Sequence, residues 1–172
     1  MEKTILVFSD SHGNASLMKQ ALEANPTADI IHLGDGLDDL TFLNLEGRRV
    51  YSVWGNFEGW AYPAPKGDDT YEKVVEISGT RILIMHGHTR SVKSTMYAAT
   101  LAAIEANADL LLYGHTHIPT EEYLPSGSSV GGTVLKKPLR IMNPGTVGKG
   151  YSLSYGVLTF RDGVLLTSHF KK

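Results

Sequence analysis

Cysteine is absent from this 172-residue chain. Disulfide bonds and thiolate-bound zinc are therefore excluded. Long apolar runs are absent too: residues 4–9 are too short for a signal peptide, and no window approaches the length of a membrane span. The lack of cysteine fits a reducing compartment, and the lack of long apolar runs argues against secretion or a membrane span, so we expect a cytoplasmic protein without a membrane partner.

The chain also lacks an excess of charge of one sign. Its 16 Lys and Arg residues and 18 Asp and Glu residues leave a net charge of -2. A nucleic-acid-binding domain is expected to be basic, so the sequence carries no strong nucleic-acid signature. The length and the 42% hydrophobic content predict a single globular domain over residues 1–172.

Four short apolar runs each end at a polar loop that contains glycine or serine. They cover residues 5–8, 29–33, 49–54 and 109–113. Between the first two runs, Leu17, Met18, Ala21 and Leu22 fall on one helical face. We expect Asn14 to cap this helix and Asn25-Pro26 to end it. The alternation of strand, loop and helix, with a weak helix at 38–43, predicts a parallel sheet in the front part of the chain.

The later part of the chain is richer in strand signals. We expect a hairpin from 71–77 and 81–85, a helix at 91–106, and a second hairpin from 121–124 and 133–135. Further strands are expected at 139–142, 155–160 and 164–168, and this back half is expected to be antiparallel. The predicted fold class is α/β (α+β): a two-sheet sandwich of mixed parallel and antiparallel strands, with helices on both outer faces (αββα).

Five loops that follow apolar runs carry residues able to bind metal ions. They read Asp10-Ser11-His12, Gly34-Asp35, Gly55-Asn56, His86-Gly87-His88 and Gly114-His115-Thr116-His117. Ligands bind at the carboxyl ends of strands in parallel sheets. In an extended segment, alternate residues such as Asp10 and His12 point to the same side. Asp-x-His or Gly-Asp alone is an ordinary sequence, but the joint occurrence predicts a site for two divalent cations.

Five of the seven histidines lie in these loops, and the other two fit structural roles. We expect His32 to be a hydrogen-bonded core residue and His169 to be solvated. Carboxylate and imidazole ligands without thiolate suit Mn, Fe, Zn, Co or Ni better than Ca or Mg. Two such ions, two aspartates and a bridging hydroxide leave one net positive charge, which favours a singly charged phosphodiester.

Taken together, these motifs resemble the calcineurin-like metallophosphoesterase family, in its small single-domain phosphodiesterase branch. The similarity extends to Asn143-Pro144-Gly145-Thr146, which resembles that branch's Asn-Pro-Gly-Ser loop. It implies a two-sheet sandwich and in-line attack on phosphorus by a metal-bridging hydroxide. It also implies two metal ions, with Mn favoured and Ni or Fe as further candidates.

The resemblance implies a role for each residue of the five loops. The first metal would be bound by Asp10, His12 and His117, and the second by Asn56, His86 and His115. Asp35 would bridge the two metals. Asn56 and His88 are the candidate catalytic residues.

One position departs from the wider family, in which many members have Gly-Asn-His-Asp/Glu at the third motif. Here Phe57 stands where that histidine is thought to protonate the leaving group. The remaining candidates for the acid are His88, Glu58 or a water molecule. Phe57 and Glu58 are also candidate substrate contacts. The aromatic group of Phe57, Trp60 and Tyr62 either stacks on a flat part of the substrate or packs its own loop.

The leading hypothesis is a binuclear metal-dependent phosphodiesterase acting on a small phosphodiester. One alternative is a non-enzymatic interaction module, as in a retromer subunit that has lost part of this metal site. Another is a phosphomonoesterase or protein phosphatase. Every expected ligand position carries a competent residue, which favours an enzyme. An exposed edge strand and the aromatic loop are candidate surfaces for a homo-oligomer.

Overall fold

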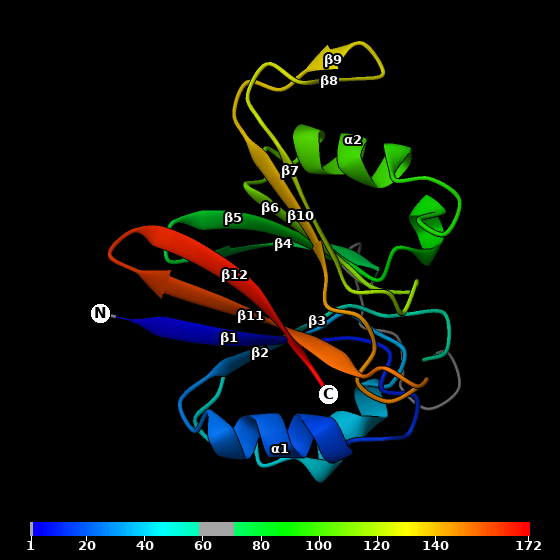
Figure 1. The fold of residues 1–172 in the computed structure, drawn as a ribbon, viewed down its shortest axis with the longest axis vertical. Coiled ribbons are helices and arrows are strands. Elements are labelled where there is room, and N and C mark those ends of the chain that lie inside the picture. The colour runs from blue at the N-terminus through cyan, green and yellow to red at the C-terminus, as the bar shows by residue number, and fades with distance from the viewer. Residues whose placement is uncertain (1, 59–70) are drawn as a thin grey trace.

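The computed structural model describes residues 2–58 and 71–172. Two five-stranded sheets pack face to face, with one α-helix on the outer side of each (Figure 1). This is the predicted sandwich of mixed parallel and antiparallel strands. Among the described residues, neither α-helix has the length and apolar character needed to cross a bilayer.

The first sheet has the order β12-β11-β1-β2-β3. Its strands are β1 (Lys3–Phe8), β2 (Asp29–His32), β3 (Val50–Ser52), β11 (Ser154–Arg161) and β12 (Val164–Lys171). The strands β1, β2 and β3 are parallel, as predicted, and Phe8, His32 and Ser52 lie in register near their carboxyl ends. The loops that follow these three strands therefore leave the same edge of the sheet.

The second sheet has the order β4-β5-β6-β10-β7. Its strands are β4 (Glu72–Ile77), β5 (Thr80–Met85), β6 (Leu110–Tyr113), β7 (Thr120–Leu124) and β10 (Leu139–Asn143). The predicted hairpin of β4 and β5 is confirmed. The strands β5 and β6 are parallel, with Met85 beside Tyr113, so their following loops also leave one edge together.

Three hydrophobic layers hold the sandwich together. The layer between the sheets contains Ile5, Val7 and Ile31 from the first sheet and Ile82, Ile84 and Leu110 from the second. Helix α1 (Ser16–Ala24) buries Leu17, Met18, Ala21 and Leu22 against the first sheet, as its periodicity predicts. Helix α2 (Tyr97–Glu105) packs Ala99, Ala102 and Ala103 against the second sheet. Small side chains let this helix approach closely.

Short 3-10 helices follow two of the loops. The first, η1 (Leu37–Phe42), occupies the expected weak helix, and the second, η2 (His88–Arg90), comes after β5. The predicted helix at 91–106 is too long, because Ser91 adopts a positive φ of 54° and α2 begins only at Tyr97. The predicted cap is displaced as well: Asn14 accepts the Ser16 N–H, but Ala15 occupies the N-cap position.

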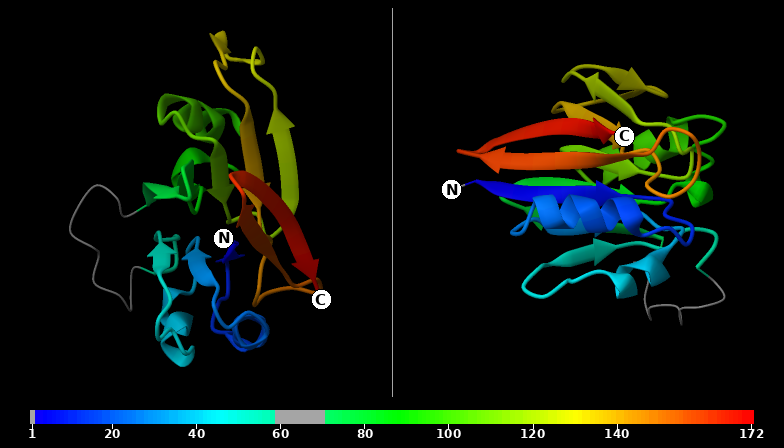
Figure 2. Two further views of the ribbon diagram at one scale, coloured as in Figure 1. Left: turned by 90° about the vertical axis from the view of Figure 1, so that its left-hand side faces the viewer. Right: turned by 60° about the horizontal axis from the view of Figure 1, so that its bottom comes forward.

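The second predicted hairpin, from 121–124 and 133–135, is wrong. Strand β7 instead pairs antiparallel with β10 along five residue pairs. The serine- and glycine-rich turn closes on itself as β8 (Ser129–Val130) and β9 (Thr133–Val134), which extend beyond the second sheet (Figure 2). The back half is not uniformly antiparallel either, because β10 runs parallel to β6.

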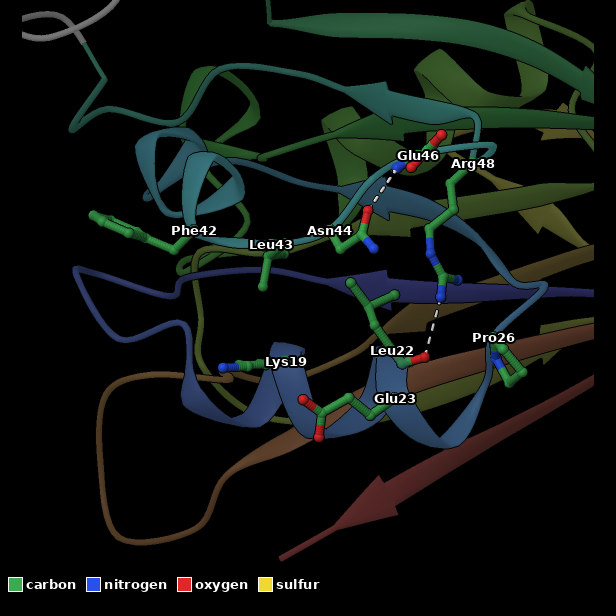
Figure 3. Close-up of a pocket in the computed structure, with 9 residues that line it drawn as sticks. All are labelled: Lys19, Leu22, Glu23, Pro26, Phe42, Leu43, Asn44, Glu46 and Arg48. Carbon is green, nitrogen blue, oxygen red and sulfur yellow. Dashed lines mark hydrogen bonds between the residues drawn. The ribbon is translucent and has the colours of Figure 1, made fainter.

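A cavity of about 290 Å³ lies between α1 and the segment at 42–48, on the outer side of the first sheet (Figure 3). Arg48 forms part of its lining and donates hydrogen bonds to the carbonyl groups of Leu22, Asn25 and Ala28. This arginine thereby binds carbonyl groups at and just beyond the end of α1, in addition to the Asn25 and Ala28 N–H groups that Leu22 O and Asn25 O accept. No residue of the five ligand-bearing loops lines the cavity.

Candidate metal centre

The five ligand-bearing loops meet at one end of the sandwich, on the right in Figure 1. Backbone hydrogen bonds join them in pairs: the Asp10 N–H donates to Gly34 O, and the Gly114 N–H donates to His86 O. Asp10 Oδ2 accepts a hydrogen bond from the His115 N–H at 3.0 Å, which links the two sheets. Loops from distant parts of the sequence are therefore held as one unit.

The first ligand cluster consists of Asp10, His12 and His117, with ligand atoms that all lie within 4.8 Å of one another. Asp10 Oδ1 lies 3.0 Å from His117 Nε2 and 3.5 Å from His12 Nε2. The two imidazole Nε2 atoms lie 3.3 Å apart. The resemblance assigns the same three residues to one metal.

The second cluster consists of Asp35, His86 and His115, within the same 4.8 Å limit. His86 Nε2 lies 3.3 Å from Asp35 Oδ2 and 3.1 Å from His115 Nδ1. Asp35 Oδ2 also lies 3.8 Å from His12 Nε2 of the first cluster. Asp10 Oδ1 of the first cluster lies 4.0 Å from His86 Nε2 of the second. The two clusters therefore adjoin, and each aspartate lies within 4.0 Å of an imidazole nitrogen of both.

The donor atoms of this centre fit cations between them. Asp10 Oδ1 is buried and accepts no hydrogen bond from the described residues, although three imidazole nitrogens lie within 4.0 Å of it. His86 Nδ1 lies 2.8 Å from Leu33 O, so it donates there, and in the neutral imidazole the Nε2 lone pair faces the cluster. A buried carboxylate oxygen without a donor is costly unless a cation or a proton compensates it.

The charges of the centre are coupled through burial and close contact. Burial raises the pKa of Asp10, but the imidazoles of His117 and His12 outweigh it, so the pKa lies well below its usual value. The pKa of Asp35 is also lowered, because its hydrogen bond with His86 outweighs burial. Both carboxylates are therefore held in the anionic form that binds metal.

The imidazoles respond in opposite directions. Burial lowers the pKa of His86, but contact with Asp35 and the charge of Asp10 raise it above its usual value. Burial and the neighbouring His86 lower the pKa of His115 to about 4. The same two causes lower the pKa of His88. His86 is therefore the second-cluster imidazole at which protons compete most strongly with a metal.

Five of the proposed ligands adopt the left-handed backbone conformation. The φ angles of Asp10, His12, Asp35, His115 and His117 lie between 46° and 69°. Such angles are uncommon for non-glycine residues and concentrate at functional sites. Asp10 and His12 therefore converge through positive φ angles, and the expectation that an extended segment aligns them is wrong.

Two further candidates lie near the clusters. Asn56 is exposed and lies between Gly55 and Phe57, and it remains a predicted ligand and catalytic residue. The His88 ring centroid lies 5.3 Å from that of His86, and its buried Nδ1 has no hydrogen-bond partner among the described residues. His88 is thus placed beside the second cluster.

The two candidate substrate contacts differ in accessibility. Phe57 is 65% exposed, and its ring lies edge-on to His12 at a centroid distance of 5.4 Å. Glu58 is only 4% exposed, and both of its carboxylate oxygens accept backbone N–H groups. Its predicted roles as acid or substrate contact therefore do not fit this placement. Trp60 and Tyr62 lie outside the described residues.

Several supporting residues were not anticipated from the sequence as partners of the loops. Thr146 donates to Asp10 O at 2.8 Å, and Asn143 donates to Gly114 O at 3.0 Å. Ser9 donates to Asp10 Oδ2 at 2.5 Å. Only the resemblance of residues 143–146 to a family loop pointed to this region. Ser9 has a signal in the sequence as the polar residue directly after an apolar strand, and Asn143 is the polar last residue of β10.

The two remaining histidines have structural roles. His32 is fully buried, and its Nδ1 accepts the Gly34 N–H at 3.1 Å, which confirms the prediction of a hydrogen-bonded core residue. His169 was expected to be solvated, and this is wrong. Its Nε2 lies 2.7 Å from Asn143 O, and Arg140 Nη1 donates to Thr167 Oγ1, so β12 lies beside β10 there.

Comparison with known proteins agrees with this geometry. The family model described as a calcineurin-like phosphoesterase superfamily domain matches residues 4–163. A Bacillus subtilis (strain 168) protein, the probable metallophosphoesterase YsnB, is 31% identical over 163 residues, which cover 92% of this chain and 85% of that protein.

Solved structures with lower identity share the fold. A predicted phosphoesterase from Streptococcus pneumoniae TIGR4 has 22% identity and a TM-score of 0.67, with 100% of this chain and 99% of that chain covered. Vacuolar Protein Sorting 29 from Cryptosporidium parvum has 17% identity and a TM-score of 0.68, with 99% and 98% covered. A novel archaeal phosphodiesterase has 21% identity and a TM-score of 0.62, with 98% and 99% covered.

Proposed function

Because the chain belongs to the calcineurin-like phosphoesterase superfamily, we propose that it is a phosphodiesterase that works with two divalent cations. The observation that carries this proposal is the pair of adjoining ligand clusters, with Asp35 within 4 Å of an imidazole nitrogen of each. Each cluster offers one carboxylate and two imidazoles, a donor set that suits Mn, Fe, Co, Ni or Zn. Mn is the favoured ion.

In this proposal Asp10, His12 and His117 hold the first cation, and Asn56, His86 and His115 hold the second. Asp35 is shared between them. When bound, such a pair supplies a nucleophilic water at neutral pH and neutralises the phosphoryl oxygens for in-line attack. The protein orients the donors: Leu33 O fixes the His86 ring, and the His115 and Phe57 N–H groups fix the two carboxylates.

A diester is favoured over a monoester by charge, and the residue at position 57 favours leaving groups that need no acid. Two aspartates and one hydroxide would leave two divalent cations with one net positive charge, which a singly charged diester would neutralise. Phe57 offers an exposed apolar ring beside His12 and no proton for a leaving group. A structural neighbour is described as an archaeal phosphodiesterase, which supports the same preference.

His88 is the imidazole available beside the second cluster for contact with substrate. Its lowered pKa favours the neutral form, which suits hydrogen bonding more than proton donation. We therefore propose that leaving groups of low pKa depart without a protein acid, and that His88 orients the phosphoryl group or a water molecule.

Metal reconstitution tests this function. Purified protein is stripped with a chelator, reloaded separately with Mn, Ni, Fe, Zn or Co, and assayed on bis(p-nitrophenyl) phosphate and p-nitrophenyl phosphate. We expect two ions per chain and faster turnover of the diester. A monoester rate that exceeds the diester rate with every metal would instead identify a phosphomonoesterase or protein phosphatase.

An interaction module without enzymatic activity is the second candidate. The observation that favours it is the similarity to Vacuolar Protein Sorting 29, which spans nearly the whole chain. Metal binding without turnover of either phosphate ester would support this alternative. Complete sets of donor residues in both clusters favour the enzyme.

A homo-oligomer also stays a prediction. Strand β12 forms an edge of the first sheet, and Val164, Leu166 and Phe170 on it are exposed. Long apolar edges of this kind favour pairing with another strand. Light scattering on purified protein measures the oligomeric state directly.

A further inference from the structure

Glu58 joins two of the ligand-bearing loops through backbone hydrogen bonds. Its Oε1 accepts the N–H groups of Gly36 and Leu37 at 2.5 and 3.1 Å. Its Oε2 accepts the Gly55 N–H at 2.5 Å. The side chain is thus enclosed between the loop after β2 and the loop after β3.

These two loops approach each other too closely to tolerate side chains at their contact. A Cβ atom on Gly34, where φ is 98°, would collide with Gly55 N. A Cβ atom on Gly55 would collide with Asp35 Oδ1. The N–H groups of Gly36, Leu37 and Gly55 therefore lie close together between the two loops. Buried N–H groups require acceptors. Glu58 supplies both acceptor oxygens.

The loops joined by Glu58 carry predicted ligands of both metals. Gly36 and Leu37 directly follow Asp35, the carboxylate proposed to be shared by both cations, and Gly55 directly precedes Asn56. The link extends to the first loop, because Ser11 Oγ donates to Gly36 O at 3.1 Å. A shift of Glu58 would therefore move Asp35 relative to its partner ligands.

We propose that Glu58 is a positioning residue that sets the location of Asp35 and Asn56 within the metal centre. The inference rests on the proposed function, since it concerns the same two-metal site. Glu58 itself contacts neither cation nor substrate in this role. Its carboxylate acts only as a hydrogen-bond acceptor for the backbone on either side.

The substitution Glu58→Gln separates this role from packing. Glutamine has nearly the same shape but only one acceptor oxygen, and its amide NH₂ group is a donor. In either orientation of the amide, the NH₂ group faces at least one backbone N–H. Glu58→Asp retains both oxygens but is shorter by one methylene, so it reaches the two loops less well.

A matched control is offered by Asp29, another buried carboxylate. Its Oδ1 accepts the Arg49 N–H at 2.9 Å, and its Oδ2 pairs with Lys3. Asp29 begins β2, whereas the ligand-bearing loop follows the end of that strand. Asp29→Asn therefore also replaces a carboxylate by an amide, but at the end of β2 that lies away from the ligand-bearing loop.

Calorimetric titration of Mn²⁺ into metal-free protein tests the inference, with circular dichroism to show that each variant is folded. We expect Glu58→Gln to weaken Mn²⁺ binding by about 10- to 100-fold, the usual effect of removing a group that orients metal ligands. Glu58→Asp should fall between this variant and the wild type. Asp29→Asn should bind Mn²⁺ as the wild type does.

A second readout is the kinetic behaviour at saturating Mn²⁺. A misplaced Asp35 should lower kcat on the aryl diester by about 10-fold or more while KM changes little. Glu58→Gln protein that binds Mn²⁺ within threefold of the wild-type affinity and retains its kcat would overturn the positioning role. Wild-type protein that binds no metal would instead overturn the proposed function, so the two failures are distinguishable.

Discussion

The Nε2 atom of His86 lies 3.1 Å from the Nδ1 atom of His115, although 29 residues separate them in the sequence. Each histidine follows one of the adjacent parallel strands β5 and β6. Two imidazole nitrogens this close, with Asp35 Oδ2 3.3 Å from His86, form a ready ligand set. Asp10, His12 and His117 form a second set of the same kind, which is the arrangement that the proposed two-ion centre requires.

Substitution of the shared carboxylate should have the largest effect on activity. We expect Asp35→Asn to lower kcat/KM on an aryl diester by about 100-fold or more, because the change weakens both metal subsites at once. Steady-state kinetics at fixed Mn²⁺ measures the loss, with Asp29→Asn as the control for removal of a carboxylate. A smaller loss than that of every single-histidine variant would contradict the bridging role.

Loss of a partly exposed ligand should remove one metal without unfolding the protein. His117 lies in a loop at the edge of the centre, and its side chain is 30% exposed. We expect His117→Ala to bind one ion in place of two, with a change in unfolding free energy below about 1 kcal/mol. Metal analysis and chemical denaturation measure the two quantities, and Ile118→Ala serves as an exposed neighbour control. Full metal-dependent activity in His117→Ala would remove this residue from the ligand set.

The residue at position 57 should determine which leaving groups are accepted. With Phe57, we expect aryl diesters to turn over much faster than alkyl diesters, because no acid stands ready for a poor leaving group. Phe57→His should raise the alkyl rate by about 100-fold, the lower end of general acid catalysis, with little effect on the aryl rate. Equal aryl and alkyl diester rates in the wild type would contradict the role assigned to position 57.

Metal binding should weaken as the solution becomes acidic. The pKa of His86 is raised above its usual value by contact with Asp35 and the charge of Asp10, which outweigh burial, so this imidazole gains a proton earlier than usual as pH falls. A protonated imidazole cannot bind metal, so activity should already be falling when the pH drops to the usual imidazole pKa of about 6.5. Mn²⁺ titrations between pH 8 and pH 5 measure the effect. An affinity and a rate that stay constant down to pH 5 would argue against imidazole ligation.

The metal-free fold should also lose stability in acid because of His32. Burial lowers the pKa of His32 from 6.5 to about 4. The folded-state pKa of His32 lies below the unfolded value. The stability that neutral His32 supports is therefore fully present above pH 6.5 and is lost as pH falls toward 4. Between pH 7 and pH 5 this group should cost about 2 kcal/mol of unfolding free energy.

The variant His32→Asn isolates that contribution, because asparagine retains an acceptor for the Gly34 N–H that His32 Nδ1 now accepts. Urea denaturation of the metal-free wild type and of the variant at pH 7 and pH 5 gives, for each protein, the slope of unfolding free energy against pH. We expect the variant to lose less stability in acid than the wild type. Identical slopes would show that His32 does not remain neutral in the folded protein.

Much of the framework was predictable because its signals are local. Apolar runs such as residues 5–8 and 29–33 predict buried strands, and the parallel order of β1, β2 and β3 follows from the helix and loops between them. The hairpin of β4 and β5 was predictable from Ser78-Gly79. The pairing of β7 was not, because a strand with charged residues such as Glu121 and Glu122 carries no signal of its distant partner β10.

The same difference between local signals and distant contacts applies to the metal centre. The order and chemistry of the ligand residues can be recognised in the chain, because each follows a strand within a few residues. The contacts of Glu58 could not be recognised, because one of its oxygens accepts the backbone N–H groups of Gly36 and Leu37, which lie 22 and 21 residues away in the sequence. The positive φ angles of Asp10 and His12 also depend on contacts with other loops.

By itself, then, the amino-acid sequence determined which donor groups this protein contains, which strands precede them and the family to which it is similar. Only the tertiary structure decided how far apart those donors lie, which lone pairs face one another and which carboxylates are occupied by the backbone. The physical reason is that donor identity is a property of single residues, whereas their spacing depends on hydrogen bonds such as that from His115 N–H to Asp10, across 105 residues.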